Sequence, residues 1–451
     1  MNPEPDGPGA AHHEPFRFRT ADSLRRKAQA LGVKLPFSED LTPLLAPAPI
    51  AERVAPNRIV VQPMEGVDGA LNGAPTELTV RRYRRFAKGG SGVIWFEATS
   101  AVPDGRSNPH ALMLNSETLP AFIALVQTTR RAARTRFPGR HEPFLIVQVT
   151  HAGRFSGPAA NHVPRVADGV GPSVWTDAEL DRLRDTFVDA IRLAAEAGFD
   201  AVDVKACHGY LVNELLAARG RGNSRYGGDF AGRTRFLLEV IAGAREEVPS
   251  MRLAVRLNAA DFVPRGFGMA ADGSSDVDVT EPVELVRRLR ALGCCLLNVT
   301  AGVPRFAPHI GRPCDRPAGG GNQPCEHPLA GVTRLLEFAR VLQEAASPMP
   351  VVGTGFSWLR QFWPHVAAGA IGAGFCGLAG VGRLAFAYPD APADLMTHGA
   401  LVRSKCCVTC SYCTELMRAA QPTGCVVRDR EVYAPPRTTK QQTVDRHRPP
   451  S

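Results

Sequence analysis

The sequence predicts an α/β fold in which eight parallel strands close into a (β/α)8 TIM barrel, with a short cysteine-rich extension after it. Two observations lead to this fold. Short apolar runs alternate with amphipathic helical patterns, and parallel strands need such crossover helices between them. Eight of these units are found, which favours a closed barrel over a doubly wound sheet with insertions, the alternative topology.

The eight strands are predicted from short runs rich in β-branched and other apolar residues. Helical patterns separate these runs, for example at 335–345. The strands are expected at 59–63, 93–97, 145–150, 201–205, 252–257, 295–299, 350–353 and 373–377.

The helix before the fourth strand shows both of its boundaries. Thr176 and Glu179 form a capping box, in which each side chain satisfies a free backbone N–H. Gly198 supplies the left-handed residue that ends the helix. The helix before the sixth strand is expected to repeat this arrangement, with Thr280 as N-cap and Gly293 at its end. The apolar stripe of the first helix is Leu180, Leu183, Phe187, Ile191 and Ala194.

Four regions are predicted along the chain. Residues 1–20 and the C-terminal tail are rich in proline and polar residues, a composition typical of disorder. Residues 302–328 form a long Pro/Gly-rich loop, which is unusual inside a compact domain and therefore a candidate functional loop. The regions are an N-terminal tail with a short helix (1–43), the barrel (44–400), the cysteine-rich extension (401–436) and a disordered tail (437–451).

The composition argues against several classes of protein. The formal net charge is +9, but the basic residues are spread along the chain, so no nucleic-acid partner is expected. No run approaches the roughly 18 apolar residues of a membrane helix, and the N-terminus lacks a signal-peptide pattern. We expect a cytoplasmic protein whose 11 cysteines are thiols or metal ligands rather than disulfides. The oligomeric state stays open, with a homo-oligomer among the options.

Polar residues follow the fourth strand, and barrel enzymes carry their active sites at the C-terminal ends of the strands. Alternation along this strand places its valines against the helices and turns Lys205 into the mouth of the barrel. Lys205, His208 and Tyr210 then supply an electrophile and proton donors for catalysis. In the alternative interpretation, Lys205 pairs with Asp203 and His208 is a rim histidine.

Other positions at the strand ends indicate a cofactor with a phosphate group. Gln148, near the end of the third strand, carries an amide suited to the edge of a heteroaromatic ring. Glycine-rich loops follow the last two strands at 353–355 and 380–383, where barrels commonly bind phosphate, and Arg383 adds a charged donor. Gly-x-Gly-x-x-Gly does not follow the first strand, so FMN fits better than NAD bound in a Rossmann domain.

Several segments between about residues 44 and 400, taken together in order and spacing, resemble the Old Yellow Enzyme family of flavin barrels. One such segment alone would say little about the family, whereas the whole series in this order is a strong indication of it. By this resemblance the protein uses NAD(P)H and FMN to reduce an electron-poor alkene conjugated to a carbonyl or nitro group. The segments are 57–64, 97–99, 151–154, 208–211, 223–228, Arg256 and 382–383.

The resemblance also implies roles for individual residues. Hydride passes from NAD(P)H to flavin N5 and then to the β-carbon of the small-molecule substrate. Lys205 and His208 are expected to hold the substrate oxygen, and Tyr210 to protonate the α-carbon. The implied FMN contacts, on the ring, its pyrimidine edge, its N1/O2 side and the phosphate, are Pro63, Met64, Ala98, Gln148, Arg256, Gly355, Gly382 and Arg383.

Two residues depart from the family pattern. Lys205 stands where the family usually has histidine, and its charge should bind an enolate-like oxygen or a carboxylate more strongly than neutral imidazole does. We therefore predict an acidic or strongly polarised substrate. Glu65 stands where many members have threonine or cysteine near flavin O4, and a carboxylate pointing at the ring would lower the flavin potential.

A cysteine cluster follows the barrel. Cys407, Cys410, Cys413 and Cys425 have the dense spacing of thiolate metal sites, and Cys406 precedes the first of them. The cluster resembles the [4Fe–4S] site of dienoyl-CoA reductases and trimethylamine dehydrogenase, although the gaps between cysteines differ slightly. A zinc site and reduced thiols are the alternatives. Those relatives continue into FAD- and NAD-binding domains and this sequence stops at 451, which leaves two roles open for the cluster, electron transfer with an external donor or a structural role.

Other functions stay open. The same site can run oxidatively, as in an amine demethylase. The barrel can be a platform for a metal- or redox-sensing cysteine cluster, in which case Lys205 and Tyr210 are dispensable. A phosphate-binding lyase would use Lys205 as a Schiff base and hold no flavin.

Overall fold

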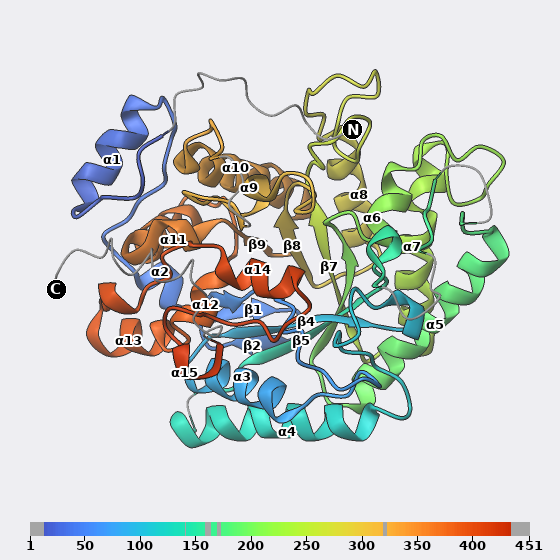
Figure 1. The fold of residues 1–451 in the computed structure, drawn as a ribbon, viewed down its shortest axis with the longest axis horizontal. Coiled ribbons are helices and arrows are strands. Elements are labelled where there is room, and N and C mark those ends of the chain that lie inside the picture. The colour runs from blue at the N-terminus through green and yellow to red at the C-terminus, as the bar shows by residue number, and fades with distance from the viewer. Residues whose placement is uncertain (1–12, 140, 158–163, 169–172, 319–322, 434–451) are drawn as a thin grey trace.

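The computed structural model describes residues 13–139, 141–157, 164–168, 173–318 and 323–433, so the disorder predicted for 1–12 and 437–451 lies outside the described residues. Eight strands form the central sheet. They are β3 (Ile59–Val61), β4 (Val93–Ser100), β5 (Phe144–Thr150), β6 (Ala201–Ala206), β7 (Arg252–Asn258), β8 (Leu296–Thr300), β9 (Val351–Gly353) and β10 (Leu378–Val381). All neighbours are parallel, and β10 pairs with β3 to close the barrel, which confirms the predicted fold (Figure 1).

Helices surround the barrel and pack on its outer face, and their apolar side chains form one continuous core with those of the strands (Figure 1). None of the described helices is long and apolar enough to span a membrane. The longer helices are α1 (Ala21–Ala30), α3 (Glu77–Lys88), α4 (Leu119–Arg136), α5 (Asp177–Glu196), α7 (Phe230–Glu247), α8 (Thr280–Ala291), α10 (Pro328–Ala346) and α11 (Trp363–Gly372). The shorter ones are α2 (Thr42–Leu45), α6 (Leu211–Ala217), α9 (Pro308–Gly311), α12 (Arg383–Ala387), α13 (Ala391–His398), α14 (Tyr412–Arg418) and α15 (Arg430–Tyr433).

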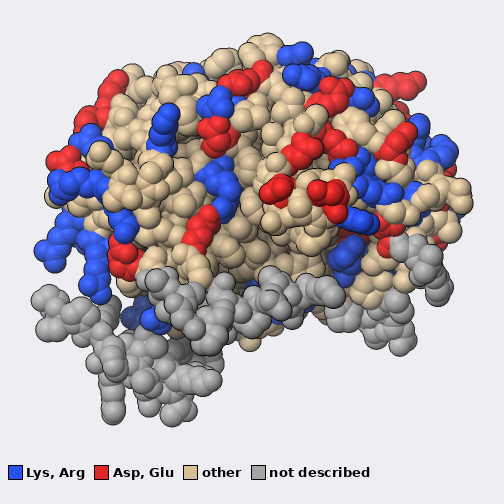
Figure 2. Space-filling view, turned by 90° about the horizontal axis from the view of Figure 1, so that it is seen from above, with Lys and Arg blue, Asp and Glu red and all other residues tan. Residues whose placement is uncertain are grey.

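The charges of the molecule are mixed rather than gathered on the face seen in Figure 2. Lysine and arginine side chains alternate there with aspartate and glutamate. The net charge of +9 therefore produces no continuous basic surface on that face.

The helix α5 forms as the sequence predicts. The Thr176 hydroxyl accepts the N–H of Glu179 at 3.3 Å, and the Glu179 carboxylate accepts the N–H of Thr176 at 2.9 Å. The predicted apolar stripe is buried against the barrel, where each large side chain contributes about 1.5–3 kcal/mol. Gly198 has φ of +89°, the left-handed conformation that ends the helix. On β6, Lys205 is turned into the barrel mouth as expected.

Two element boundaries differ from the prediction. The last strand is Leu378–Val381 and not 373–377, because Gly374 has φ of +74° and turns the chain after α11. Thr280 is the first residue of α8 rather than its N-cap, because the Asp278 carboxylate accepts the N–H of Thr280 at 3.0 Å and takes the capping role.

Two N-terminal features were not expected. Residues 13–20 are ordered, since Phe16 is buried with its ring centroid 5.1 Å from that of Trp358. A hairpin of β1 (Ala48–Ile50) and β2 (Arg53–Ala55) precedes the barrel. Its buried side chains pack with those at the N-terminal ends of the barrel strands, so the hairpin closes that end of the barrel.

A buried charge network joins α3 to β4. The Arg82 guanidinium donates to the carboxylates of Asp68 and Glu97, and all three side chains are almost fully buried. The Glu97 carboxylate also accepts the N–H of Gly66 at 2.6 Å and the hydroxyl of Tyr83 at 3.2 Å. Burial raises the pKa of Glu97 to about 7, although Arg82 opposes the shift. Arg82 therefore supplies the positive charge that balances the two buried carboxylates.

Replacing Arg82 by methionine is expected to lower the free energy of unfolding by about 3–5 kcal/mol, because two buried carboxylates lose their cation. Urea unfolding followed by tryptophan fluorescence measures the change. Arg84→Met is the matched control, since Arg84 is exposed on the same helix and should change stability by less than about 0.5 kcal/mol. Equal, small effects of both substitutions would show that the network does not stabilise the fold.

Candidate active site

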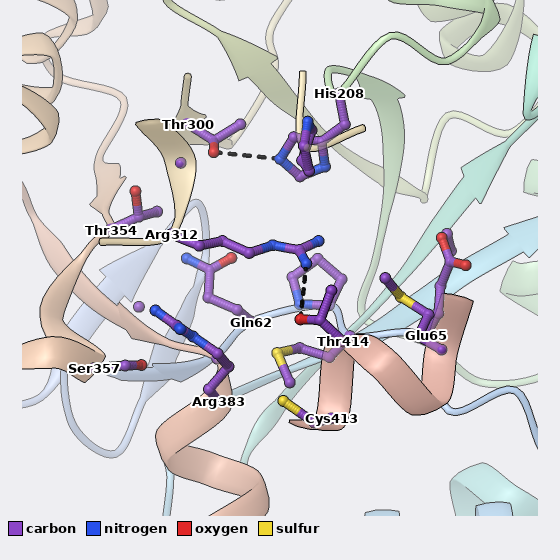
Figure 3. Close-up of a pocket in the computed structure, with 18 of the residues that line it drawn as sticks. Gln62, Glu65, His208, Thr300, Arg312, Thr354, Ser357, Arg383, Cys413 and Thr414 are labelled. Atoms are coloured by element: carbon purple, nitrogen blue, oxygen red, sulfur yellow. Dashed lines mark hydrogen bonds between the residues drawn. The ribbon is translucent and has the colours of Figure 1, made fainter. Parts of the chain in front are cut away.

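A cavity opens at the C-terminal ends of the barrel strands. Its volume is about 970 Å³ with its mouth included, enough for a cofactor and a small substrate. Helix α14 of the extension lies over it and contributes Cys413, Thr414 and Met417 to one wall (Figure 3). Ten of the residues predicted to contact cofactor or substrate line this cavity, namely Pro63, Met64, Ala98, Gln148, Lys205, His208, Arg256, Gly355, Gly382 and Arg383.

One end of the cavity carries groups that suit a phosphate. A Cβ atom on Gly382 would lie 2.8 Å from Sδ of Met64, so a larger residue there would displace the Met64 side chain. Thr354 Oγ is buried and has no hydrogen-bond partner among the described residues. Arg383 is buried and donates to the carbonyl of Pro313 at 2.8 Å, which leaves further N–H groups for a ligand. A hydroxyl and a guanidinium beside glycines form an anion-binding end.

The orientation of the Gln148 amide follows from its neighbour Asp203. The Asp203 carboxylate is fully buried and accepts from Trp95 Nε1 at 2.9 Å and from the backbone N–H of Arg256 at 2.6 Å. Burial raises the pKa of Asp203 to about 6, so the group is an ionised acceptor at neutral pH. Gln148 therefore turns its nitrogen to Asp203, at 2.5 Å, and its carbonyl oxygen is left for the cavity.

Gln62 lines the same part of the cavity and was not among the predicted site residues. Its Oε1 accepts from Asn298 at 2.7 Å, and its Nε2 is buried without a partner among the described residues. Gln62 directly precedes Pro63 and ends a strand, which is the signal that would have identified it. Arg256 lies nearby, with Nη1 3.4 Å from the carbonyl oxygen of Pro63.

At the other end of the cavity, Lys205 and Glu65 are lining residues, whereas the predicted proton donor Tyr210 does not line the cavity itself and contacts these two side chains. Tyr210 donates its hydroxyl to Glu65 Oε1 at 2.7 Å, and Lys205 Nζ lies 3.5 Å from the same oxygen. Lys205 Nζ also lies 3.4 Å from the centroid of the Tyr210 ring. Ser107 donates to the second oxygen of Glu65 at 2.9 Å. Lys205 thus pairs with Glu65 and not with Asp203, and Glu65 is held by these three side chains.

Burial sets the protonation of these groups. Burial lowers the pKa of Lys205, and the Glu65 carboxylate acts in the opposite direction. Burial, followed by the charge of Glu65, raises the pKa of Tyr210 well above its usual value, so the phenol stays protonated. Burial and then Arg256 lower the pKa of His208 well below its usual value, so its imidazole is neutral. His208 Nε2 lies 3.3 Å from the hydroxyl of Thr300, and a φ of +67° turns the residue toward the cavity (Figure 3).

The long loop between β8 and α10 also contributes to the cavity, as its composition led us to expect. It supplies Pro304, Gly311, Arg312 and Pro313 to the lining. Arg312 reaches across the cavity in Figure 3, and its guanidinium donates to Thr414 of α14 at 3.3 Å. Sequence analysis did not single out Arg312, because nothing in a loop sequence tells which of its arginines points inward.

The four predicted metal-binding cysteines all line a second, smaller cavity. Cys407 is buried and Cys410, Cys413 and Cys425 are partly exposed around a space of about 350 Å³. Backbone N–H groups point at two of the sulfurs, from Thr409 to Cys407 at 3.4 Å and from Arg428 to Cys425 at 3.3 Å. Cys413 lines both cavities. Within the described residues, no three His, Cys, Asp or Glu side chains stand close enough to hold a single metal ion.

The extension is fastened to the barrel by an ion cluster on α3. Arg81 donates to both oxygens of Asp429 at 2.8 Å, and Arg85 donates to the same carboxylate. The N–H of Thr423 donates to the carbonyl of Gly66 at 2.7 Å. The wall formed by α14 is therefore tied at its C-terminal side to the loop that follows β3.

Comparison with known proteins places this geometry among flavin enzymes. The model of the NADH:flavin oxidoreductase / NADH oxidase family matches residues 43–285. An NADPH dehydrogenase of Geobacillus thermodenitrificans (strain NG80-2) is 29% identical over 347 residues, which cover 70% of this chain and 91% of that protein. An NADH oxidase of Thermoanaerobacter brockii is 27% identical over 341 residues, and there the match covers 70% of this chain and 49% of that protein.

Two solved structures share the fold. A 2-naphthoyl-CoA reductase in complex with 2-naphthoyl-CoA superposes with a TM-score of 0.68 at 20% identity, over 87% of this chain and 57% of that one. An old yellow enzyme homologue from Zymomonas mobilis superposes with a TM-score of 0.58 at 22% identity, over 80% of this chain and 94% of that one. The chain thus shares the barrel fold of both proteins, and the match leaves over two fifths of the larger one uncovered.

Proposed function

The chain belongs to the NADH:flavin oxidoreductase / NADH oxidase family, and from this membership we propose that it reduces an electron-poor C=C bond conjugated to a carbonyl group. The resemblance to the Old Yellow Enzyme family is thereby confirmed, and the protein is an FMN-dependent NAD(P)H oxidoreductase. The observation that carries the proposal is that Lys205 and His208 line a cavity whose other end suits a phosphate, while Tyr210 contacts Lys205 and the lining residue Glu65.

The donor and acceptor groups of the cavity fit FMN. The carbonyl of Gln148 and the unpartnered Nε2 of Gln62 offer an acceptor and a donor to the pyrimidine edge of a flavin. Arg256 adds positive charge beside them, and the free hydroxyl of Thr354 and the Arg383 guanidinium suit the phosphate. When bound, FMN supplies to the substrate β-carbon the hydride it has received from NAD(P)H.

The side chains at the opposite end act on the substrate carbonyl and α-carbon. The Lys205 ammonium and the neutral His208 ring hold the carbonyl oxygen while negative charge develops on it. Tyr210 gives its hydroxyl proton to the α-carbon, so hydride and proton together saturate the C=C bond. Because this hydroxyl donates to Glu65 in the described state, it must rotate toward the substrate before transfer.

Anaerobic absorption spectroscopy tests the proposal in two steps. NAD(P)H should bleach the flavin bands of the purified protein, and an enone should restore them with formation of one saturated product per flavin. Protein that is colourless and takes up no FMN would overturn the flavin assignment. Bleaching without reoxidation by any of a panel of enones would overturn the reductase proposal alone.

The Arg383→Gln variant is expected to bind FMN about 10- to 100-fold more weakly, because a charge-assisted contact to the phosphate is lost. Equilibrium dialysis of FMN against the apoprotein measures the dissociation constant. Arg403→Gln is the control, since Arg403 is exposed beyond the main cavity. An unchanged affinity of Arg383→Gln would exclude this arginine from the phosphate site.

We also propose that Cys407, Cys410, Cys413 and Cys425 hold a [4Fe–4S] cluster. Four sulfurs around a common cavity supply the complete ligand set of such a cluster. Backbone N–H groups directed at two of these sulfurs are the kind of hydrogen bond that tunes iron–sulfur sites. The cluster would exchange single electrons with an external protein donor, at a position next to the flavin cavity because Cys413 borders both spaces.

The contact between Tyr210 and Glu65 also supports an oxidative direction. The phenol oxygen would take an α-proton from a saturated substrate while its own proton passes to the Glu65 carboxylate in the same step, and the β-hydride would leave for the flavin, so no free phenolate is required. Oxidised enzyme mixed anaerobically with a saturated ketone or amine distinguishes the directions. Bleaching of the flavin without NAD(P)H would support this second function, and unchanged bands would exclude it for the compounds used.

A further inference from the structure

Arg312 is a cation in the main cavity for which the described residues provide no carboxylate partner. The other charged residues of the cavity each have an assignment, because Lys205 pairs with Glu65 while Arg256 and Arg383 belong to the flavin side. The hydroxyl of Thr414 accepts a hydrogen bond from the Arg312 guanidinium at 3.3 Å, but it is neutral and does not balance the charge. The guanidinium therefore has N–H donors left over within a partly closed space.

A structural role explains Arg312 poorly. Burial, with a smaller effect from Arg383, lowers the pKa of Arg312 to about 10, so the side chain remains charged at neutral pH. Outside the cavity, the buried arginines Arg82, Arg221 and Arg233 all have acidic partners. A desolvated cation without such a partner destabilises a protein unless a ligand supplies the anion.

The position of Arg312 indicates which ligand that is. Its backbone belongs to the loop after β8, and its side chain extends from the Thr354 side of the cavity toward the middle, below His208 and beside Thr414 (Figure 3). Its charge contributes to the lowered pKa of His208, and Arg383, Arg256 and Glu65 all act on the pKa of Arg312, so the guanidinium lies between the flavin side and the catalytic groups. Pro304 and Met417 supply apolar surface around it.

We propose that Arg312 binds a carboxylate of the substrate, so that the preferred acceptor is an alkene with an activating carbonyl group and a separate carboxylate. The inference rests on the reductase proposed above and narrows its substrate class. Lys205 and His208 hold the activating oxygen, while the guanidinium takes the carboxylate through paired N–H groups. Lys205 and Arg312 thus each bind a different oxygen-bearing group of the substrate, and Glu65 keeps its hydrogen bond from Tyr210.

A free carboxylic acid and its neutral methyl ester test the proposal. In the wild type, kcat/KM for 4-oxopent-2-enoate should exceed that for its methyl ester. The Arg312→Ala variant should lose about 10- to 100-fold on the acid and change less than about twofold on the ester. Arg312→Lys should recover part of the loss, and Arg316→Ala is the control because Arg316 is exposed in the same loop.

Equal losses on acid and ester would overturn the proposal. So would a parallel loss of FMN affinity in Arg312→Ala, since that result assigns the arginine to the cofactor. Calorimetric binding of 4-oxopentanoate and of its methyl ester to the FMN-loaded enzyme needs no turnover. If the wild type reduces neither alkene, the reductase proposal fails. The calorimetric experiment then tests Arg312 by itself, because Arg312→Ala should weaken binding of 4-oxopentanoate and leave binding of its methyl ester unchanged.

Discussion

The Tyr210→Phe enzyme is expected to be reduced by NAD(P)H at the wild-type rate but to pass hydride to an enone about 10²- to 10⁴-fold more slowly. The phenol ring lies against Lys205 and its hydroxyl donates to Glu65, and both of these residues line the cavity together with His208. Phenylalanine keeps the ring and removes the transferable proton. Stopped-flow absorbance of the flavin, with NAD(P)H and enone added in separate anaerobic experiments, resolves the two half-reactions.

Tyr226→Phe is the control for removing a buried phenol. The Tyr226 hydroxyl donates to Asp181 at 2.5 Å outside the cavity, so neither half-reaction should slow. In the wild type, the raised pKa of Tyr210 predicts a second half-reaction that does not slow between about pH 7 and about pH 9, because the phenol stays protonated there. Equal slowing of both half-reactions by Tyr210→Phe would reject Tyr210 as the proton donor.

The Cys410→Ser protein is expected to lose the iron–sulfur cluster, with bound iron falling from about four atoms per chain to less than about one. Serine removes one of the four sulfurs that line the second cavity. Iron and acid-labile sulfide, measured on protein purified without oxygen, report the loss, together with the dithionite-sensitive absorption of the cluster.

Cys406→Ser is the matched control, although Cys406 directly precedes the proposed ligand Cys407. Its sulfur lies 3.8 Å from the carbonyl oxygen of Val402 and does not line the cavity of the four cysteines. This variant should therefore keep its iron. If the wild type contains one zinc atom and no sulfide, the four cysteines form a zinc site instead of an iron–sulfur cluster. Loss of iron from both variants would contradict the assignment of the ligands.

Much of the barrel follows from local patterns that the folded chain preserves. The capping box at Thr176 and Glu179 depends on residues three apart, and alternation along β6 determines which side of the strand Lys205 occupies. The last strand was misplaced because 373–377 and Leu378–Val381 are both short and apolar, with no period to separate them. Phe16 is ordered through Trp358, a contact that composition does not reveal.

Some residues of the candidate site were predictable from the sequence and others were not, as with the fold. Residues at strand ends, such as Gln148 and Lys205, were identified because strand position alone brings them to the cavity. The direction of Glu65 was not predictable, since it depends on Tyr210 and Ser107 in other parts of the chain. Arg312 lies on a loop whose path is determined by packing against α14 rather than by any repeat in the sequence.

The wall that α14 places between the two cavities has a consequence for how the enzyme matures. Because Cys413 lines both cavities, a chain whose extension has not yet packed onto the barrel leaves the flavin compartment without one side. The ion cluster at Asp429 then ties that side down on the barrel. The cofactor compartment is consequently complete only after the C-terminal extension has folded onto a barrel whose sheet is already closed.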